Sequence, residues 1–163
     1  YFFLNPTKKL RVRQIEREVK VPLPSAIRYT KEFVKEGILK KENIANVNFY
    51  SADRSSKKYL LEKKLFNLKS LSYSGLIDFL IDECHNPTII VFGSYSKGED
   101  LEDSNIDLYV ETSSKKIKLS TFENKLKRNI QLFTHKNIKN VKNKELANNI
   151  INGITLNGFM EVF

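Results

Sequence analysis

The sequence predicts a mixed α/β (α+β) chain, in which a larger C-terminal part forms a mixed sheet with flanking helices and a smaller N-terminal part forms helices and a hairpin. Three observations predict this. After residue 70, short apolar runs rich in β-branched residues alternate with segments of helical periodicity. Residues 5–52 show two helical segments and then two strand-like segments. The charge is also uneven: residues 1–68 carry 16 lysines and arginines against 7 acidic residues, whereas residues 69–163 carry 12 of each.

The N-terminal part is expected to begin with two short helices separated by a tight turn. Residues 11–20 carry three apolar side chains at helical spacing, and the run Val-Pro-Leu-Pro at 21–24 ends this helix. Ser25 is the expected N-cap of a second helix, which ends at Gly37. The apolar side chains expected to point inward are Val12, Ile15 and Val19 in the first helix and Ile27, Phe33 and Val34 in the second.

Two strands are expected next, over residues 38–42 and 47–51, around a polar turn at 43–46. Helix, tight turn, helix and hairpin is the order of a winged helix-turn-helix, and this segment resembles those of archaeal and bacterial transcription regulators. The resemblance, together with the basic charge, implies DNA binding. Two glutamates on the second helix fit DNA contact poorly, so protein contact or dimerisation stays open as an alternative. The expected DNA-contacting residues are Ser25, Arg28, Tyr29, Lys31, Lys35, Lys40 and Lys41.

Residues 53–84 are expected to be helical, as two helices with a break near residues 68–72. The first of these helices connects a winged domain at 1–52 to a second domain at 70–163, with the connector spanning 53–69. Its apolar stripe is expected to face the core and its lysines to face water. The stripe comprises Tyr59, Leu60, Leu65 and Leu68, and the lysines are Lys57, Lys58, Lys63 and Lys64.

The second domain is expected to follow the order α-β-α-β-α-β-α-β. A loop or short basic ribbon is expected at 113–119, strands at 89–92 and 130–134, and a short final strand at 159–163. Ser120 and Glu123 form a capping-box pattern, in which Glu123 reaches back to the Ser120 amide. Asn143 is expected to cap a last helix, which ends at Gly153 and turns Leu146, Ile150 and Ile151 inward.

The most informative segment of this domain is a Gly-Ser pair that follows the apolar run 89–92. Asn105-Ile106-Asp107 comes ten residues later, at the start of a second apolar run. Glycine lets a backbone approach a phosphate closely, the Ser94 hydroxyl adds a donor, and Gly98 permits a second tight turn. Positions 105 and 107 are two apart on a strand, so both side chains point to one face and could bind one cation.

This pattern, Gly93-Ser94 followed by Asn105-x-Asp107, resembles the signature of the nucleotidyltransferase superfamily with the DNA polymerase β-like fold, over roughly residues 70–163. The resemblance implies Mg²⁺ and ATP, with phosphate-binding roles for Gly93, Ser94 and Gly98 and catalytic, metal-binding roles for Asp107 and Asn105. Two positions depart from the family. Asn105 stands where the family has its first aspartate, and the third carboxylate is replaced by Gln131. Whether the site is catalytically active is therefore open. The acidic residues that could substitute are Glu111, Asp100, Glu102 and Asp103.

Three functions are in competition at this stage. The first is Mg²⁺-dependent nucleotidyl transfer from ATP to an unknown acceptor, and the chain is similar to minimal nucleotidyltransferases, some of which act as antitoxins by adding AMP to a partner toxin. The second is a DNA-binding transcription regulator whose degenerate nucleotidyltransferase domain only senses nucleotide or forms dimers. The third is a pure interaction module, with a protein partner and no chemistry of its own.

Composition excludes several other classes. No segment approaches the length of apolar sequence that spans a membrane, and no signal peptide is visible. The single Cys84 cannot form an internal disulfide, and neither His85 nor His135 has a partner at zinc-binding spacing, so a cytoplasmic location is expected. The sequence starts at Tyr1 rather than at a methionine, so we expect residues upstream.

Overall fold

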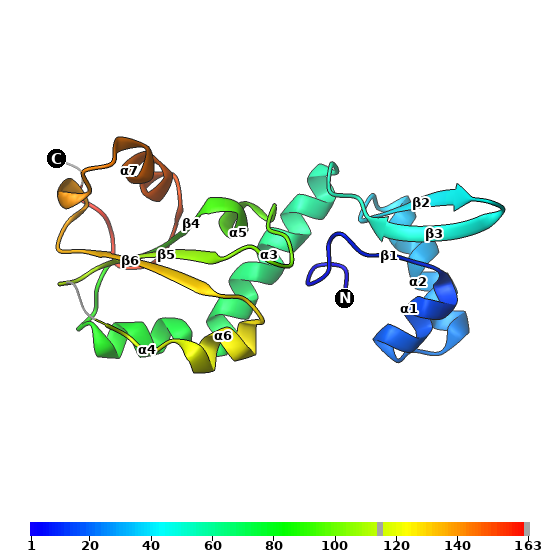
Figure 1. Ribbon diagram of the computed structural model, residues 1–163, viewed down its shortest axis with the longest axis horizontal. Helices are drawn as coiled ribbons and strands as arrows, with labels where there is room; N and C mark the ends of the chain where they lie inside the picture. The colour runs from blue at the N-terminus through cyan, green and yellow to red at the C-terminus, as the bar shows by residue number, and fades with distance from the viewer. Residues whose placement is uncertain (114–115, 162–163) are drawn as a thin grey trace. The chain divides into compact units, whose positions relative to one another are not determined.

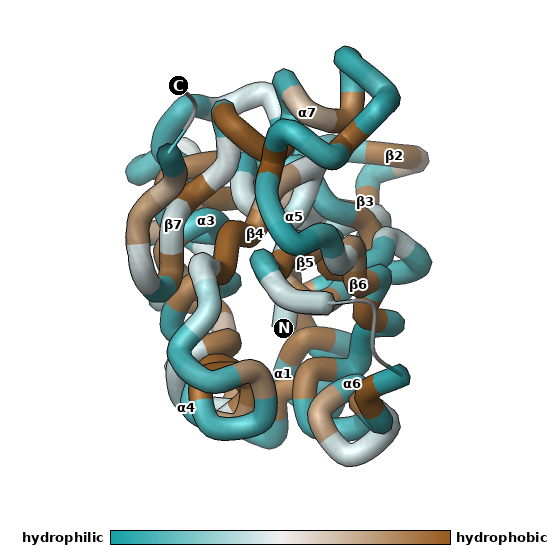
Figure 2. The backbone as a smooth tube through the Cα atoms, turned by 90° about the vertical axis from the view of Figure 1, so that its left-hand side faces the viewer, coloured by the Kyte–Doolittle hydropathy of each residue, from teal (hydrophilic) through white to brown (hydrophobic). Residues whose placement is uncertain are grey.

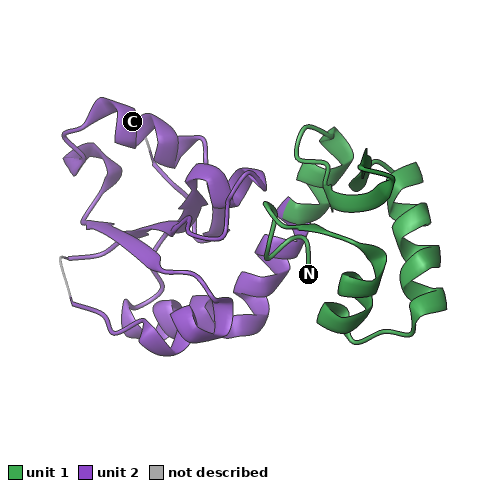
Figure 3. Cartoon of the chain, turned by 45° about the vertical axis from the view of Figure 1, so that its right-hand side comes forward, with its two compact units in different colours: residues 1–63 green, residues 64–163 purple. Residues whose placement is uncertain are grey.

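The computed structural model describes residues 1–113 and 116–161 and divides into two compact units, residues 1–63 and residues 64–163 (Figure 3). The division falls within helix α3 (Lys57–Ser74), which contributes residues to both units. The three-part division at residues 52 and 69 stays a prediction. Each unit is described by itself below.

The first unit contains two helices and a three-stranded antiparallel sheet. Strand β1 (Lys9–Leu10) precedes helices α1 (Val12–Val19) and α2 (Leu23–Lys35), and the hairpin β2 (Leu39–Ile44) and β3 (Val47–Ala52) follows. The strand order is β1-β3-β2. Ala45 and Asn46 connect the hairpin and both have positive φ, as a tight two-residue hairpin turn requires. The expected helices and hairpin are therefore confirmed as elements.

Helix α2 differs from the prediction in its start and in its inner face. It begins at Leu23 with Pro22 as N-cap, so Ser25 lies in its first turn rather than capping it; Pro24 also lies in this turn, where proline is tolerated because its missing N–H would have no helical partner. Ala26 and Thr30 form the buried face, and the Thr30 hydroxyl donates to the Ala26 carbonyl at 2.8 Å. Small side chains one turn apart let α2 pack closely against the rest of the first unit. The helix is therefore oriented with its larger apolar residues toward the outside. The residues wrongly expected inside are Ile27 and Phe33 of α2 and Val19 of α1.

The long helical region divides at Gly75, not near residues 68–72. Gly75 has φ +78°, a left-handed conformation that glycine adopts readily, and it separates α3 from α4 (Leu76–Glu83). The prediction that the lysines of α3 face water is wrong for Lys63, which is fully buried and donates to the Phe3 carbonyl at 3.0 Å. Leu65, expected in the core, is 51% exposed.

The second unit is built on a mixed sheet in the order β6-β5-β4-β7. Strands β5 (Ile106–Glu111) and β6 (Ile130–His135) are parallel, whereas β4 (Ile89–Phe92) pairs antiparallel with β5 and with β7 (Ile154–Asn157). Helices α4 and α6 (Ser120–Leu126) lie on one side of the sheet and α7 (Lys144–Ile151) lies on the other (Figure 1). The expected alternation of helices and strands is confirmed, and the fold is compatible with a nucleotidyltransferase-like one.

The core of this unit lies on both faces of the sheet. On the α4 and α6 side, Ile89 and Val91 pack with Leu108 and the buried leucines of these helices. On the α7 side, Ile90 and Phe92 pack with Tyr109, while Ile150 of α7 is fully buried. Strand β4 is buried on both faces, which explains its uninterrupted apolar sequence (brown in Figure 2).

The capping-box prediction is wrong. The Glu123 carboxylate accepts from the Ile130 amide at 2.9 Å, so it caps the start of β6 instead of the start of α6, whose N-cap is Leu119. The capping of α7 by Asn143 is confirmed, since its side chain accepts from the Glu145 and Leu146 amides at 2.9 and 3.1 Å.

The C-terminal elements also differ in detail from the prediction. Ile150 is buried as expected, but Ile151 is 43% exposed, because adjacent helical residues point about 100° apart. The final strand is β7, and residues 159–161 form no strand; residues 162–163 of the expected strand lie outside the described residues. Of the expected loop or ribbon at 113–119, residues 114–115 lie outside them too, and 116–119 have no helix or strand. Within the described part of the chain, no helix is long and apolar enough to cross a membrane.

Candidate functional site

The site begins where β4 ends and helix α5 (Gly93–Lys97) starts. Phe92, the last residue of β4, pairs with Asp107 of β5, so the Gly-Ser corner lies beside this aspartate. Gly93 has φ +71°, and a Cβ atom at this position would overlap Oδ2 of Asp107 and lie 3.4 Å from its Cγ. Glycine is therefore required here both by the backbone conformation and by the closeness of the carboxylate. The structure places the corner and Asp107 together, as the sequence indicated.

Asp107 lies next to two amides rather than to other carboxylates. Its register partner across the parallel pair β5 and β6 is Gln131, and Asn105 donates through Nδ2 to Gln131 Oε1 at 3.4 Å. These three side chains thus share one face of the sheet. Asp107 is half-buried, and desolvation raises the pKa of its carboxyl above the ordinary value. An added cation beside this carboxylate would favour its charged form.

The donor set fits one Mg²⁺ better than two. In residues 1–113 and 116–161 there is no group of three or more His, Cys, Asp or Glu side chains that could hold a metal. Asp107 offers a carboxylate and Asn105 a neutral amide oxygen, and Mg²⁺ is commonly held by one or two carboxylates together with substrate phosphates and water. A pair of cations needs more negative charge than one carboxylate supplies.

The other acidic residues considered as substitutes either bond other groups or line a separate cavity. Glu111 accepts from the Tyr109 hydroxyl at 3.2 Å and from the Ile138 amide at 3.0 Å, at the other end of β5. Asp100 is buried in an ion pair. Glu102 and Asp103 line a polar cavity of about 420 Å³ that Ser104, the neighbour of Asn105, also lines. Glu111 and Asp100 are thus held by other partners.

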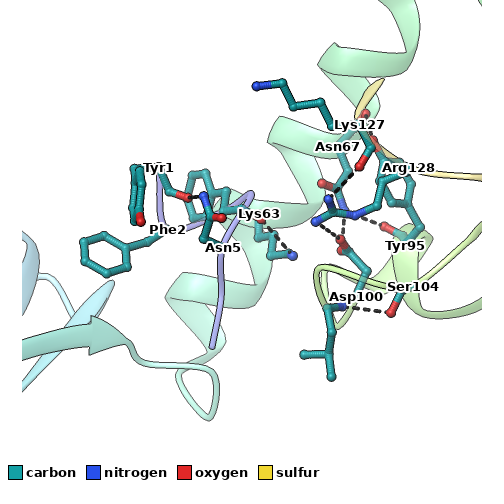
Figure 4. Close-up of polar contacts among 12 residues, drawn as sticks. Tyr1, Phe2, Asn5, Lys63, Asn67, Tyr95, Asp100, Ser104, Lys127 and Arg128 are labelled. Carbon is teal, nitrogen blue, oxygen red and sulfur yellow. Dashed lines mark hydrogen bonds and ion pairs between the residues drawn. The ribbon is translucent and has the colours of Figure 1, made fainter. Parts of the chain in front are cut away.

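A buried polar network fixes the loop that connects the corner to Asn105. Asn67 of α3 donates through Nδ2 to Asp100 Oδ1 at 2.7 Å and to the Tyr95 carbonyl at 2.9 Å. Arg128, just before β6, lies 3.7 Å from Asp100 Oδ2, and the three side chains converge in Figure 4. Gly98 ends α5 with φ +75°, so the second tight turn is confirmed. Sequence reasoning missed Asn67 and Arg128, because residues more than 25 positions away leave no local signal.

The expected DNA-contacting residues lie on the surface of the first unit. Arg28, Tyr29, Lys31 and Lys35 on α2 and Lys40 and Lys41 on β2 are exposed, whereas Ser25 is half-buried. The Arg28 guanidinium lies 4.8 Å from the centre of the Tyr29 ring and 4.0 Å from Glu32, and Lys40 lies 3.2 Å from Glu42. Helix α1 adds a basic stripe that was missed, although its spacing was visible in the sequence. That stripe comprises Arg13 and Arg17, and the exposed Lys20 follows at the C-cap.

Comparison with known families bears on the second unit. Residues 76–152 match the family model of the nucleotidyltransferase domain. The matched range contains Gly93, Ser94 and Asp107, together with the amides at 105 and 131. The match supports a nucleotidyl-transfer-like function at the level of the family. Comparisons with curated proteins and with solved structures gave no match.

Proposed function

We propose that the second unit binds ATP with one Mg²⁺ and slowly transfers the nucleotidyl group to an acceptor, whose attacking atom bonds the α-phosphorus as pyrophosphate leaves. The observation that carries this proposal is the contact between Gly93 and the Asp107 carboxylate, within the segment that matches the nucleotidyltransferase domain. That contact brings a phosphate-binding turn and a cation ligand to one place. A triphosphate with its cation needs both.

Each residue of the corner has a separate role in this proposal. Gly93 leaves space for the Asp107 carboxylate beside the corner, the Ser94 hydroxyl donates to a phosphate oxygen, and Gly98 sets the turn that closes the corner. Asp107 and Asn105 would hold Mg²⁺, which neutralises charge on the phosphates when bound. Gln131 holds the Asn105 amide by the hydrogen bond between them.

Binding is expected to be the stronger property and transfer the weaker one. The two-cation arrangement clamps both the attacking and the leaving oxygen, and this site has one carboxylate and two amides where the family has three carboxylates. The two amides in place of carboxylates therefore weaken the stabilisation of the transition state more than they weaken the binding of nucleotide in the ground state.

Isothermal titration with ATP tests binding. We expect heat in the presence of Mg²⁺, less without it, and none for Asp107→Ala, while the exposed Asp78→Ala serves as the control that keeps binding. Transfer is then measured with ATP labelled on its α-phosphate. The double change Asn105→Asp and Gln131→Asp is expected to raise the rate. Absence of heat with every nucleotide would remove the proposal.

We infer a second candidate function, DNA binding by the first unit. Its support is the exposed basic set on α2 and β2 and the helix-helix-hairpin order. In this proposal the unit is a winged helix-turn-helix of a transcription regulator, and the second unit senses nucleotide or forms dimers. Affinity for duplex DNA should fall steeply with salt and should weaken in Arg28→Ala but not in the exposed Lys136→Ala of the second unit. Affinity that is flat with salt counts against it.

A further inference from the structure

The first unit contains a cavity with aromatic walls that neither proposed function uses. Its volume is about 330 Å³, and its walls come from the N-terminal segment, from the junction of α2 with β2, and from the first two turns of α3. Tyr1 and Phe33 are 37% and 38% exposed, so the cavity is open to solvent. The residues around it all belong to the first unit; they are Tyr1, Phe2, Phe3, Phe33, Ile38, Leu39 and Glu62.

Hydrogen bonds from α3 fix the aromatic wall that the N-terminal segment supplies. The Tyr59 hydroxyl donates to the Phe2 carbonyl at 3.3 Å, and the Lys63 ammonium donates to the Phe3 carbonyl at 3.0 Å. The Tyr1 and Phe2 rings contact each other edge to face at 5.4 Å, side by side in Figure 4. The backbone of this segment is therefore held in place before any ligand arrives, so binding needs little further ordering of the chain.

The cavity is acidic although the unit around it is basic. In residues 1–63 lysines and arginines outnumber acidic residues by 15 to 7, yet among the residues described around the cavity Glu62 alone has a charged side chain. Lys58 lies 2.9 Å from Glu62, but both side chains are well exposed, so this ion pair is weak. The hydrogen bond to Glu62, and then the charge of Glu36, raise the pKa of Lys58, so a second carboxylate lies near the pair. Burial lowers the pKa of the Tyr1 amino group, which reduces its positive charge.

Aromatic rings and a carboxylate together favour an organic cation as the occupant. The face of an aromatic ring attracts a positive group, and the carboxylate attracts the same group, whereas it repels an anion. The first unit already contains such a contact, since the Arg28 guanidinium lies 4.8 Å from the centre of the Tyr29 ring, which stacks on the Phe33 ring at 6.2 Å. A volume of about 330 Å³ is near the lower end for small-molecule sites, so the cation must be small.

We propose that this cavity binds a small organic cation, in which a protonated or quaternary amine is joined to a flat apolar body. The apolar body packs between the rings of the N-terminal segment and Phe33, and Glu62 faces the positive group in place of Lys58. This proposal depends neither on the nucleotide site of the second unit nor on DNA binding by the first.

Titration calorimetry on the full chain tests the proposal with three probes of similar size. Benzyltrimethylammonium is the cation, N,N-dimethylbenzamide is the neutral comparison and phenylacetate is the anion. We expect the cation to bind about tenfold or more tightly than either of the others, because it alone gains from both the rings and the carboxylate.

Variants of the charged pair then test the role of Glu62. Glu62→Gln should weaken binding of the cation about tenfold, whereas Lys58→Gln should strengthen it, because Glu62 then loses its competing partner. The matched control is Glu18→Gln, which removes the same charge from an exposed position on α1 and should bind normally. Glutamine is a good helix former, so the melting temperatures should be unchanged. Phe33→Leu keeps an apolar side chain without a ring face and should weaken binding about threefold or more.

Four results would overturn the proposal. The cation gives no heat of binding, or the neutral probe or the anion binds as tightly as the cation. Glu62→Gln and Glu18→Gln change the affinity equally, which would reduce the role of Glu62 to general surface charge. Sedimentation equilibrium shows a dimer that Phe33→Leu dissociates, which would make a second copy of the chain the occupant.

Discussion

Substitution of Gly93 by alanine tests the geometry on which the proposed nucleotide site depends. The φ of +71° places an alanine in the left-handed region, which costs about 1–2 kcal/mol for a residue with a Cβ atom. The new methyl group would also overlap the Asp107 carboxylate, and overpacking of this kind costs roughly 1–3 kcal/mol. We therefore expect Gly93→Ala to lose about 2–5 kcal/mol of unfolding free energy, together with ATP binding.

Gly75 provides the matched control for the backbone part of that cost. Its φ is +78°, almost the same, and nothing lies within 4 Å of a Cβ atom built there. Gly75→Ala should therefore lose only the conformational cost of about 1–2 kcal/mol. The difference between the two variants measures the contact with Asp107.

Urea unfolding followed by circular dichroism gives the free energies, and a double-mutant cycle isolates the contact. In the background of Asp107→Ala the carboxylate is gone, so Gly93→Ala should then cost no more than Gly75→Ala. Equal costs of the two glycine changes in the wild-type background, with no coupling to Asp107, would refute the reasoning. The corner and the aspartate would then not be in contact.

Three further predictions concern charge and capping. Burial raises the pKa of Asp107 in the folded state, so the folded chain binds the carboxyl proton more tightly than the unfolded chain. Asp107→Asn should therefore be more stable than wild type at neutral pH. A pH series of urea titrations should show this gain in unfolding free energy disappear below about pH 3.9. A gain that grows as the pH falls would contradict this. Asn143→Ala should cost about 1 kcal/mol, measured by thermal unfolding, while Asn143→Ser should recover most of it; equal loss in both variants would rule out capping. Asp100→Ala should cost about 3–5 kcal/mol, because it removes the buried ion-pair partner of Arg128; a loss below 1 kcal/mol would show that the pair contributes little.

The strands of the second unit and the closeness of the Gly-Ser corner to Asp107 were predictable because their signals are local. The apolar run before Gly93 and the ten-residue gap to Asn105 are read from consecutive residues, and the strand pairing then brings Asp107 to the corner. Asn143 was predictable for the same reason, since an N-cap acts within one turn.

The predictions that failed depend on contacts between distant segments. Lys63 is buried because a carbonyl 60 residues earlier accepts its hydrogen bond, and lysine otherwise favours water. Glu123 accepts from the amide of Ile130, seven residues later at the start of β6, and this contact cannot be read from the local capping pattern. The helical period alone did not determine which side of α2 faces inward, since small residues and large apolar residues both recur at helical spacing.

The antiparallel register between β4 and β5 makes the fold and the site depend on the same alignment. Asp107 lies opposite Phe92, while its neighbours Ile106 and Leu108 are fully buried on the other face. A slip of one residue would move the carboxylate into the packed interior and bring an isoleucine or a leucine to the corner. Insertions or deletions within either strand would therefore disrupt both the packing of the sheet and the contact between Gly93 and Asp107, whereas changes in length are better tolerated in the exposed part of the connecting loop around Asp103.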